Sequence, residues 1–372
     1  MNHEEVLLAL DEVIATVFKA FKVIGFSDQQ AFDVTRQLMY GEIRGGKRNH
    51  ALDRFAWISK QKDKTFFLDK KIVVESFDSD SNSIILDGKH GVGYSHIYEA
   101  IVCALELLKY KNSVIIGLKN TYPTNCLGDY SSIFAHHGYA SYVGSLSPDK
   151  VAFPNDGVAV LPTSGQAFGM PGNPPMILDF SIGAITNGDL NYHKKHQLKL
   201  PDGVCLDKDG KTTDDVNKVV DDQGKLIGII LPRGSESASY IMAGFGVMLM
   251  MTGIEVGIKP NTHGTFLSVR KVSPLFHTHW DELLIKLTNK DGQSMMPGHR
   301  GLRLANKVIS KRKIMIDIKK WQPLLDASSK YQHESQEQNI DEITQSIIDQ
   351  LEGNYYSSLN NETENKYSNF FK

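Results

Sequence analysis

The order of apolar and polar positions predicts helices in the first part of the chain. Residues 4–22 repeat apolar side chains at the 3.6-residue spacing of an amphipathic helix. Residues 27–30, Ser-Asp-Gln-Gln, have the form of a cap for a second helix, which we expect to end at the glycine pair 45–46. Residues 48–61 are typical of a third helix that begins near Asn49.

Strand patterns dominate the next part of the chain. Residues 71–86 alternate and turn like a β-hairpin, and a glycine-rich turn at 88–93 separates this hairpin from a helix at 96–110. A β-rich run at 113–120 follows. Further short strands are predicted at 139–146, 158–165, 174–181, 226–232 and 264–272, and helices at 281–288 and 301–308.

Residues 240–254 form the most apolar stretch of the chain. The stretch is about five residues short of the roughly 20 needed to span a bilayer, so we expect no membrane segment. Its small residues and methionines predict a core helix that is buried on all sides. The first residues carry acids at once and lack the basic start of a signal peptide. The polar residues 326–372 predict an accessory helix and a partly mobile end.

The mixture of helices and strands predicts an α/β fold. The two kinds of element do not alternate as regularly as a doubly wound sheet requires, which argues against a Rossmann domain. The glycine cluster at 88–93 reads Gly-Lys-His-Gly-Val-Gly, and this order differs from the GxGxxG of a dinucleotide-binding turn. We therefore interpret it as a structural turn.

Composition excludes several classes of function. The formal net charge of the 372 residues is -2, so the chain has no overall basic field that would attract nucleic acid. Its three cysteines are far apart, which excludes a disulfide framework and a CxxC metal knuckle and favours the reducing cytoplasm. Pairs of nearby histidines lack a third ligand at fixed spacing, so we expect no metal site.

His50 and Arg54 are the first candidates for chemistry. They are four residues apart, so on a helix both side chains point from one face. The guanidinium would hold the carboxylate of a 2-oxo acid through two parallel hydrogen bonds, while the imidazole exchanges a proton with the reacting oxygen. Such pairs are also common on solvated helix faces, where they have no catalytic role. If the pair were the only evidence, this non-functional interpretation would be favoured.

Several segments together resemble the malate/L-lactate dehydrogenase family of nicotinamide-dependent oxidoreductases. The family's glycine, Ser-His-Gly triplet and arginine are similar to residues 46–54, and Leu200 to Asp214 resembles its IPDGWAxDxxGxPTxD segment most specifically. Looser matches are Gly172-Asn173-Pro174, Asp179 to Gly183, Leu231 to Tyr240 and Met296 to Arg300. The order of these segments holds over residues 5–325, so the chain is identified as a divergent member.

The resemblance implies a non-Rossmann α/β fold with a mixed sheet, N-terminal helices and a second lobe. One two-lobed oxidoreductase domain would cover residues 1–325, with the nucleotide lobe at 73–265 and a polar extension at 326–372. A nicotinamide cofactor would lie between the lobes of a homodimer. The residues that the resemblance places at the cofactor are Asp179, Phe180, Ser181, Ile182, Gly183, Ser235, Glu236, Gly298, His299 and Arg300.

The resemblance also places a small carboxylic acid substrate in the site. Asn49, Arg54, Tyr122 and Asn120 would contact it, with His50 and Arg54 as the catalytic pair, and Asp202 or Asp207 would orient the site. For the cofactor residues, the alternative is that they are glycine, serine and proline turns kept for chain geometry.

The chain departs from the family pattern at positions that have a chemical role in the family. Pro123 stands where some members have a catalytic histidine, so His50, Tyr122 or Asp129 would have to exchange the proton. Together with Glu236 and His299, this change motivates a rival hypothesis: a non-enzymatic descendant that serves as a binding or assembly module. The leading hypothesis remains hydride transfer to or from a 2-hydroxy, 2-oxo or 2-imino acid.

Glu236 predicts a preference for NAD over NADP. It replaces a lysine of the family's pattern, and its carboxylate can accept a ribose hydroxyl but repels a phosphate. At about 4 Å and an effective dielectric constant of about 20, that repulsion is on the order of 4 kcal/mol, or roughly a thousandfold in affinity. Fluorescence titration with NADH and NADPH measures the preference, and equal affinities would contradict it.

Overall fold

The computed structural model describes residues 4–45, 51–147, 149–153, 157–234, 237–250, 263–290, 292–294, 296–332 and 339–353. Its centre is a seven-stranded mixed sheet in which β3 and β4 run parallel and the other neighbours run antiparallel. In order across the sheet, the strands are β2 (Val73–Asp78), β3 (Ser83–Val92), β4 (Ser113–Tyr122), β12 (Gly264–Lys271), β5 (Tyr139–Leu146), β8 (Gly165–Met170) and β9 (Met176–Ser181). This mixed topology confirms the predicted α/β class.

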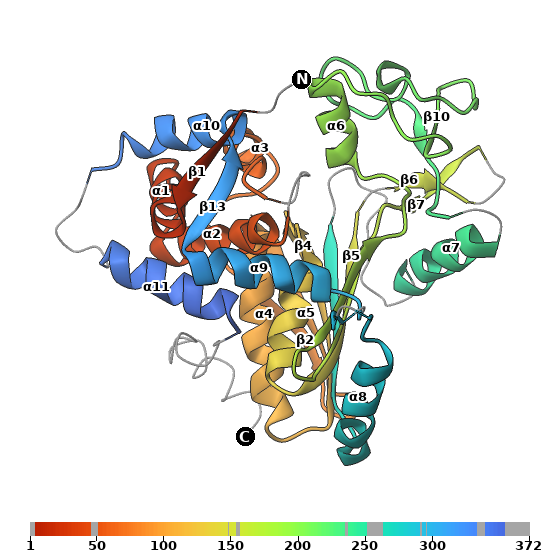
Figure 1. Cartoon of the computed structure of the whole chain (residues 1–372). Coiled ribbons are helices and arrows are strands. Elements are labelled where there is room, and N and C mark those ends of the chain that lie inside the picture. The colour runs from red at the N-terminus through yellow and green to blue at the C-terminus, as the bar shows by residue number, and fades with distance from the viewer. Residues whose placement is uncertain are drawn as a thin grey trace.

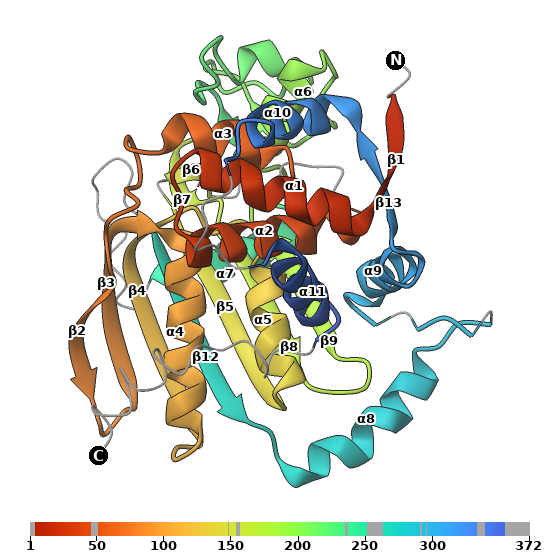
Figure 2. The same ribbon diagram turned by 90° about the vertical axis from the view of Figure 1, so that its left-hand side faces the viewer.

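Two helices, α4 (Gly93–Leu108) and α5 (Leu127–His136), cover one face of this sheet (Figure 2). Helix α4 is apolar on most of its circumference because it lies between the sheet and a further layer of helices, and its residues 100–108 are all buried. A cluster of buried apolar side chains joins these helices to β4, where Ile116 and Leu118 are fully buried.

The outer helical layer is built from both ends of the chain (Figure 1). Its helices are α1 (Leu10–Val23), α2 (Asp28–Ile43), α3 (Arg54–Gln61), α9 (His299–Lys311), α10 (Ile318–Ser328) and α11 (Ile340–Leu351). The predicted cap of α2 is confirmed, because Ser27 Oγ accepts from the Gln30 amide at 3.2 Å and the Gln30 side chain accepts from the Ser27 amide at 3.1 Å. Ile343 and Ile347 of α11 belong to the same core as α1.

The first predicted helix begins later than its pattern suggested. Residues 5–9 form a strand, β1 (Glu5–Ala9), which pairs antiparallel with β13 (Lys313–Asp317). Helix α1 starts only at Leu10. The prediction was wrong here because Val6, Leu7 and Leu8 suit a strand as well as a helix, and a partner strand some 300 residues away decides between them.

A smaller four-stranded sheet forms a second lobe, on the right of Figure 1. Its order is β10 (Cys205–Leu206), β11 (Ile229–Ile230), β6 (Asp149–Ala152) and β7 (Ala159–Pro162). The strand predicted at 226–232 is thus only two residues long. The helices near this lobe are α6 (Asn187–Lys195), the 3-10 turn η1 (Val216–Lys218) and α7 (Ser237–Met250), and α8 (Pro274–Lys286) follows the large sheet.

Helix α7 is not buried on all sides, which corrects the prediction for residues 240–254. Ala243 packs in the core of the small lobe, but Tyr240, Ile241 and Met248 are 47%, 58% and 65% exposed. An apolar composition shows that a helix avoids water, and it does not show which surface covers the helix. Residues 251–254 lie outside the described residues. No helix in the described ranges is both long and apolar enough to cross a membrane.

The place of α11 in the core makes Ile347→Ala a test of the fold. We expect the substitution to lower the free energy of unfolding by about 2–5 kcal/mol, because it opens a cavity at a fully buried position. Gln345→Ala on the exposed side of the same helix should change it by less than about 0.5 kcal/mol. Urea denaturation of both variants gives the comparison, and equal midpoints would show that α11 is not part of the core.

Candidate active site

The candidate site lies where β3, β4 and β12 meet at one edge of the large sheet. The parallel strands β3 and β4 both end there, at Val92 and Tyr122. Strand β12 starts at the same edge, because the Thr121 amide donates to the carbonyl of His263 at 3.2 Å. The ends of these strands lie between the N-terminal helices and the small lobe (Figure 1). Side chains from all three parts of the molecule therefore converge there.

Helix α3 brings Arg54 to this edge through a series of ring contacts. The guanidinium carbon of Arg54 lies 4.4 Å from the ring of Trp57, and Trp57 meets Tyr122 edge to face at 5.3 Å. On the other side of Tyr122, the ring of His263 stacks at 3.8 Å with an interplanar angle of 12°. These contacts hold an arginine, a phenol and an imidazole close together.

Tyr94 completes the inner wall of the site. It follows Gly93, the first residue of α4. A Cβ at Gly93 would come within 2.4 Å of the Pro123 carbonyl oxygen, so the glycine allows the helix to approach β4. Burial raises the pKa of Tyr94 to about 12, although the positive charge of Arg54 acts to lower it. Burial also lowers the pKa of Arg54, but its interactions with Tyr122 and Tyr94 outweigh this and the net direction is upward. The buried Nε of Arg54 has no hydrogen-bond partner.

Lys150 of β6 reaches the same edge from the small lobe. The pKa of its ammonium group is lowered by burial and then by the charge of Arg54. The pKa of His263 is lowered to about 3 by burial, by Lys150 and, to a smaller extent, by His90 and Arg54. The imidazole is therefore neutral at pH 7. We call Arg54, Tyr94, Tyr122, Lys150 and His263 the Arg54 cluster.

The predicted substrate residues are only partly brought together. Arg54 and Tyr122 lie close together in the cluster. Asn120 is two residues before Tyr122, and its amide donates to Asp87 at 2.9 Å. His50 and Asn49 lie outside the described residues, so the proposed roles of these two side chains stay predictions.

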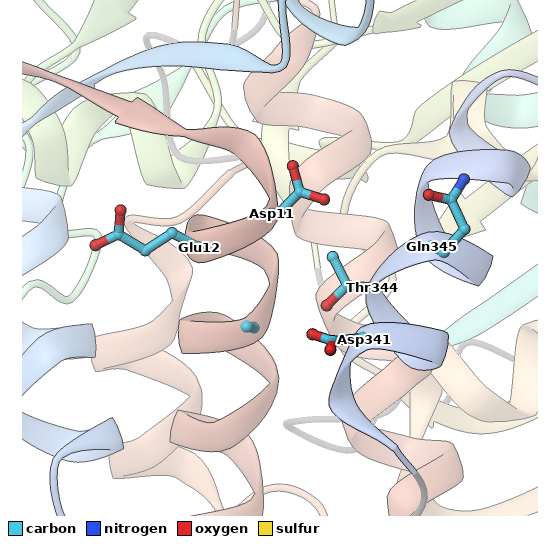
Figure 3. Close-up of a pocket in the computed structure, with 6 residues that line it drawn as sticks. Asp11, Glu12, Asp341, Thr344 and Gln345 are labelled. Carbon is cyan, nitrogen blue, oxygen red and sulfur yellow. The ribbon is translucent and has the colours of Figure 1, made fainter.

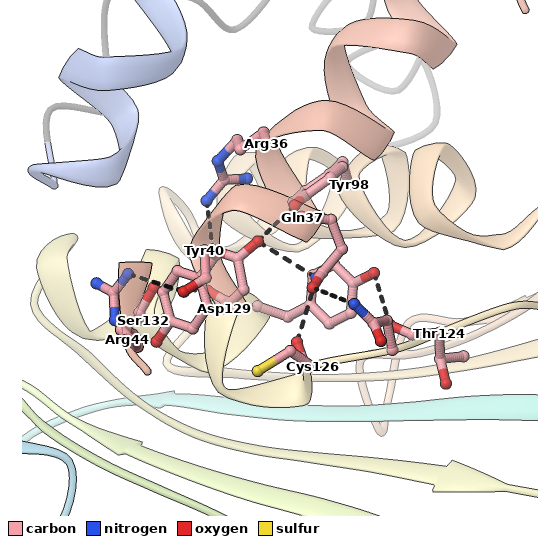
Figure 4. Close-up of polar contacts among 11 residues, drawn as sticks. Arg36, Gln37, Tyr40, Arg44, Tyr98, Thr124, Cys126, Asp129 and Ser132 are labelled. Carbon is pink, nitrogen blue, oxygen red and sulfur yellow. Dashed lines mark hydrogen bonds and ion pairs between the residues drawn. The ribbon is translucent and has the colours of Figure 1, made fainter. Parts of the chain in front are cut away.

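Asp129, one of the predicted proton carriers, belongs to a buried polar network instead (Figure 4). Its carboxylate accepts hydrogen bonds from Arg36 at 2.7 Å, Gln37 at 3.3 Å and Tyr98 at 2.5 Å. Burial raises its pKa and Arg36 opposes this shift. Because its oxygens are occupied by these donors, Asp129 is a structural partner of Arg36 and not a free base.

The predicted cofactor residues on β9 have mixed environments. The Asp179 carboxylate accepts from the Gly128 amide at 2.7 Å and from Cys126 Sγ at 3.3 Å, so it caps the start of α5. Ser181 donates to the Thr163 carbonyl at 2.6 Å, and Ile182 is fully buried. Asp202 and Asp207 lie on the exposed loop before and after Cys205 and not in the Arg54 cluster.

The end of β9 nevertheless has features that suit a dinucleotide. Ser181 and Gly183 lie at the same sheet edge as Tyr122, and Arg233 donates to the Ser181 carbonyl at 3.1 Å. Arg233 lies four residues before Ser237, the first residue of α7, and a guanidinium and a helix N-terminus each attract a phosphate. Phe180 packs between Phe168 and Phe245 below this edge. Ser235 and Glu236 lie outside the described residues.

Gly298, His299 and Arg300 lie at the opposite end of β9. Gly298 has a φ of 86° and approaches Ile177 so closely that a side chain would clash with its carbonyl. His299 Nε2 contacts the Pro175 carbonyl at 3.1 Å, and its Nδ1 contacts Ser294 Oγ at 2.7 Å. A carbonyl only accepts, so Nε2 carries the proton. Burial lowers the pKa of His299, and the ring serves as a neutral clamp.

A shallow depression of about 350 Å³ lies elsewhere, between α1 and α11 (Figure 3). Its lining includes Asp11, Glu12 and Asp341, and Asp11 is paired with Arg312. Three acidic side chains at an open surface do not suit a carboxylic acid. Among the described residues, no group of three or more histidine, cysteine, aspartate or glutamate side chains is placed to hold a metal ion.

The mixed sheet and the edge site define the fold of the malate/lactate dehydrogenase type, which differs from the Rossmann fold. A malate dehydrogenase from Entamoeba histolytica superposes with a TM-score of 0.78 at 17% identity, covering 90% of this chain and 100% of the other. The model of the malate/L-lactate dehydrogenase family matches residues 8–258. The chain therefore belongs to this family, as predicted.

Two curated relatives show the range of names in the family. A malate/(S)-sulfolactate dehydrogenase from Methanothermus fervidus is 25% identical over 61% of this chain and 65% of its own length. A Delta(1)-pyrroline-2-carboxylate reductase from Burkholderia multivorans is 24% identical over 64% of this chain and 69% of its own length. The matched part thus spans about two thirds of each relative.

Tyr94, Lys150 and His263 are the cluster residues that sequence reasoning missed. None lies in a recognisable motif, and Lys150 and His263 lie in and next to strands whose register only the folded sheet reveals. A weak signal was present for His263, because it directly precedes the strand predicted at 264–272 and strand ends commonly carry functional side chains.

The low pKa of His263 predicts how stability depends on pH. Between pH 6.5, the ordinary value, and about 3, the unfolded chain binds a proton that the folded chain excludes, so stability falls as pH falls through this range. His263→Gln should reduce this slope by up to about 1.4 kcal/mol per pH unit. Urea denaturation at pH 5 and 7.5 measures it, with His279→Gln, an exposed histidine, as the control. An unchanged slope would show that His263 is not held neutral.

Proposed function

We propose that this protein transfers a hydride reversibly between a nicotinamide cofactor and a small 2-hydroxy acid, forming a 2-oxo acid, or reduces a 2-imino acid. Family membership and the names of the relatives support this class of reaction. The observation that carries the proposal is the buried Nε of Arg54, which has no hydrogen-bond partner among the described residues. A bound carboxylate would supply that acceptor.

Arg54 is suited to hold the substrate's carboxylate. A guanidinium matches a carboxylate through two parallel hydrogen bonds, and Trp57 fixes its plane from one side. Tyr94 and Tyr122 lie beside the guanidinium, and Tyr94, whose pKa burial raises to about 12, is neutral at physiological pH and does not balance its charge. The site therefore has an unmatched positive charge at a defined place, which is what binding an organic acid requires.

Arg233 and the N-terminus of α7 would hold the phosphates of the dinucleotide. Arg233 contacts the carbonyl of Ser181 at the sheet edge shared with Arg54. The cofactor, when bound, supplies or accepts the hydride. NAD is the proposed form because of Glu236, whose carboxylate would repel the additional phosphate of NADP.

His263 is the proposed proton carrier, with His50 and Tyr122 as the alternatives. In the oxidation of a 2-hydroxy acid, the hydroxyl proton passes to a neutral imidazole nitrogen while the hydride leaves C2. An imidazole with a pKa of about 3 is a weak base. An anionic substrate would offset the charges of Lys150 and Arg54 and so raise that pKa toward the range in which proton exchange is efficient.

We further propose that the protein works as a homodimer in the cytoplasm. The exposed apolar side chains of α7 supply a surface that a second subunit would cover. The three cysteines are far apart in the sequence and offer no disulfide framework, which suits a reducing compartment.

The proposal predicts turnover of at least one member of a panel of 2-hydroxy and 2-imino acids with NAD(H). Arg54→Met should lower kcat/KM by about 100- to 1,000-fold, because charge-assisted hydrogen bonds to the carboxylate are lost. The control is Arg270→Lys, an exposed arginine at the far end of β12. Spectrophotometric assay of NADH measures the rates.

Thermal shift distinguishes this proposal from the non-enzymatic alternative. A cofactor at 100 times its Kd stabilises the native state by about 2.7 kcal/mol, which raises the melting temperature. An unchanged melting temperature with all four nicotinamide dinucleotides, together with no turnover, would leave the binding or assembly module as the better account.

A further inference from the structure

Among the described residues, no carboxylate balances the charges of the Arg54 cluster. The described groups that act on His263 are Lys150, His90, Arg54 and the stacked Tyr122, and none of them is a carboxylate. Arg54 is the one described charge that perturbs Lys150. No described carboxylate forms an ion pair with Arg54 or Lys150. In the described part of the chain, two cations thus face one site without a counterion.

The backbone fixes the position of Lys150. Its neighbour Val151 is fully buried in the small lobe and pairs with Ile230 on one side and Leu161 on the other. Successive side chains of a strand point to opposite faces, so Lys150 is directed away from that core. Strand β6 follows β5 closely, and Leu146 at the end of β5 is opposite Gly264, next to His263. The ammonium group of Lys150 therefore lies at the same sheet edge as His263.

Resting on the function proposed above, we infer that Lys150 binds a second anionic group of the substrate. While Arg54 holds the carboxylate next to the reacting carbon, Lys150 holds a second carboxylate or a sulfonate on the same short molecule. The site then selects 2-hydroxy and 2-oxo acids with two negative charges over acids with one. This assignment makes Lys150 a residue that determines specificity, separate from the proton carrier.

A doubly charged substrate fits the cluster better than a singly charged one. With a monocarboxylate on Arg54, the charge of Lys150 would stay uncompensated in a half-buried place, which is unfavourable. A second anionic group removes this cost. It also reduces the positive potential at His263, which favours proton uptake by the imidazole during oxidation.

The test compares singly and doubly charged substrates in the full-length protein. Racemic lactate carries one charge, and racemic malate and 3-sulfolactate carry two, so the last two distinguish a carboxylate from a sulfonate. We expect kcat/KM for one or both of the doubly charged acids to exceed that for lactate. Lys150→Met should lower the ratio of that value to the kcat/KM for lactate by about 10- to 100-fold, the loss expected for a hydrogen bond to a charged group.

Two control variants separate charge from structure. Lys150→Arg keeps the positive charge and should retain most of the preference. Lys208→Met removes an exposed lysine in the small lobe and should change nothing. If Lys150→Met lowers kcat/KM equally for all three acids, or raises the KM for NAD+ with each of them, Lys150 has a structural or cofactor role and the inference is wrong.

Binding without turnover gives an independent readout. With NADH present, tartronate, which carries two charges, should raise the melting temperature more than oxamate, which carries one, and Lys150→Met should abolish the difference. Turnover without any preference for charge would refute this inference alone. Absence of turnover with every acid would refute the proposed function, and this inference with it.

Discussion

The buried ion pair between Arg36 and Asp129 joins the two main layers of the molecule. Arg36 is on α2 in the outer helical layer, and Asp129 is on α5 against the sheet, with side-chain exposures of 3% and 0%. Removing one partner of such a pair typically costs about 3–5 kcal/mol, a large part of the 5–15 kcal/mol that stabilises an average domain. Tyr98 and Gln37 use the remaining acceptor positions, so the pair has one geometry.

That junction explains why the site can combine groups of different origin. Arg54 comes from the helical layer, Tyr122 and His263 from the large sheet, and Lys150 from the small lobe. Each is held by its own core, and the three cores meet at one edge. The chemistry of the cluster is therefore a property of how the layers are joined, and no single segment contains it.

Local patterns predicted much of the fold. The capping box at Ser27, the hairpin of β2 and β3, helix α4 and strand β4 follow from capping, alternation and periodicity within short windows. The failures share one cause. Strand β1 depends on a distant partner, and the exposed face of α7 depends on what covers it. Neither fact is encoded within the segment itself.

The same reasoning applies to the candidate site. Arg54 and Tyr122 were predictable because they lie in segments that resemble a family motif. In the sequence, nothing distinguishes Asp129 from an available proton acceptor. In the structure, both of its carboxylate oxygens accept hydrogen bonds from Arg36 and Tyr98. His263 is an ordinary histidine until the pairing of β12 with β4 stacks it on Tyr122. Only the register of the sheet shows which titratable groups share an environment.

The ladder between β1 and β13 has a consequence for synthesis of the protein. Its two strands are separated by about 300 residues, and the helical layer also needs α10 and α11, which follow β13. During translation, the large sheet and the small lobe emerge complete while β1 still has no partner. The layer that carries Arg54 can therefore close only after nearly the whole chain has left the ribosome.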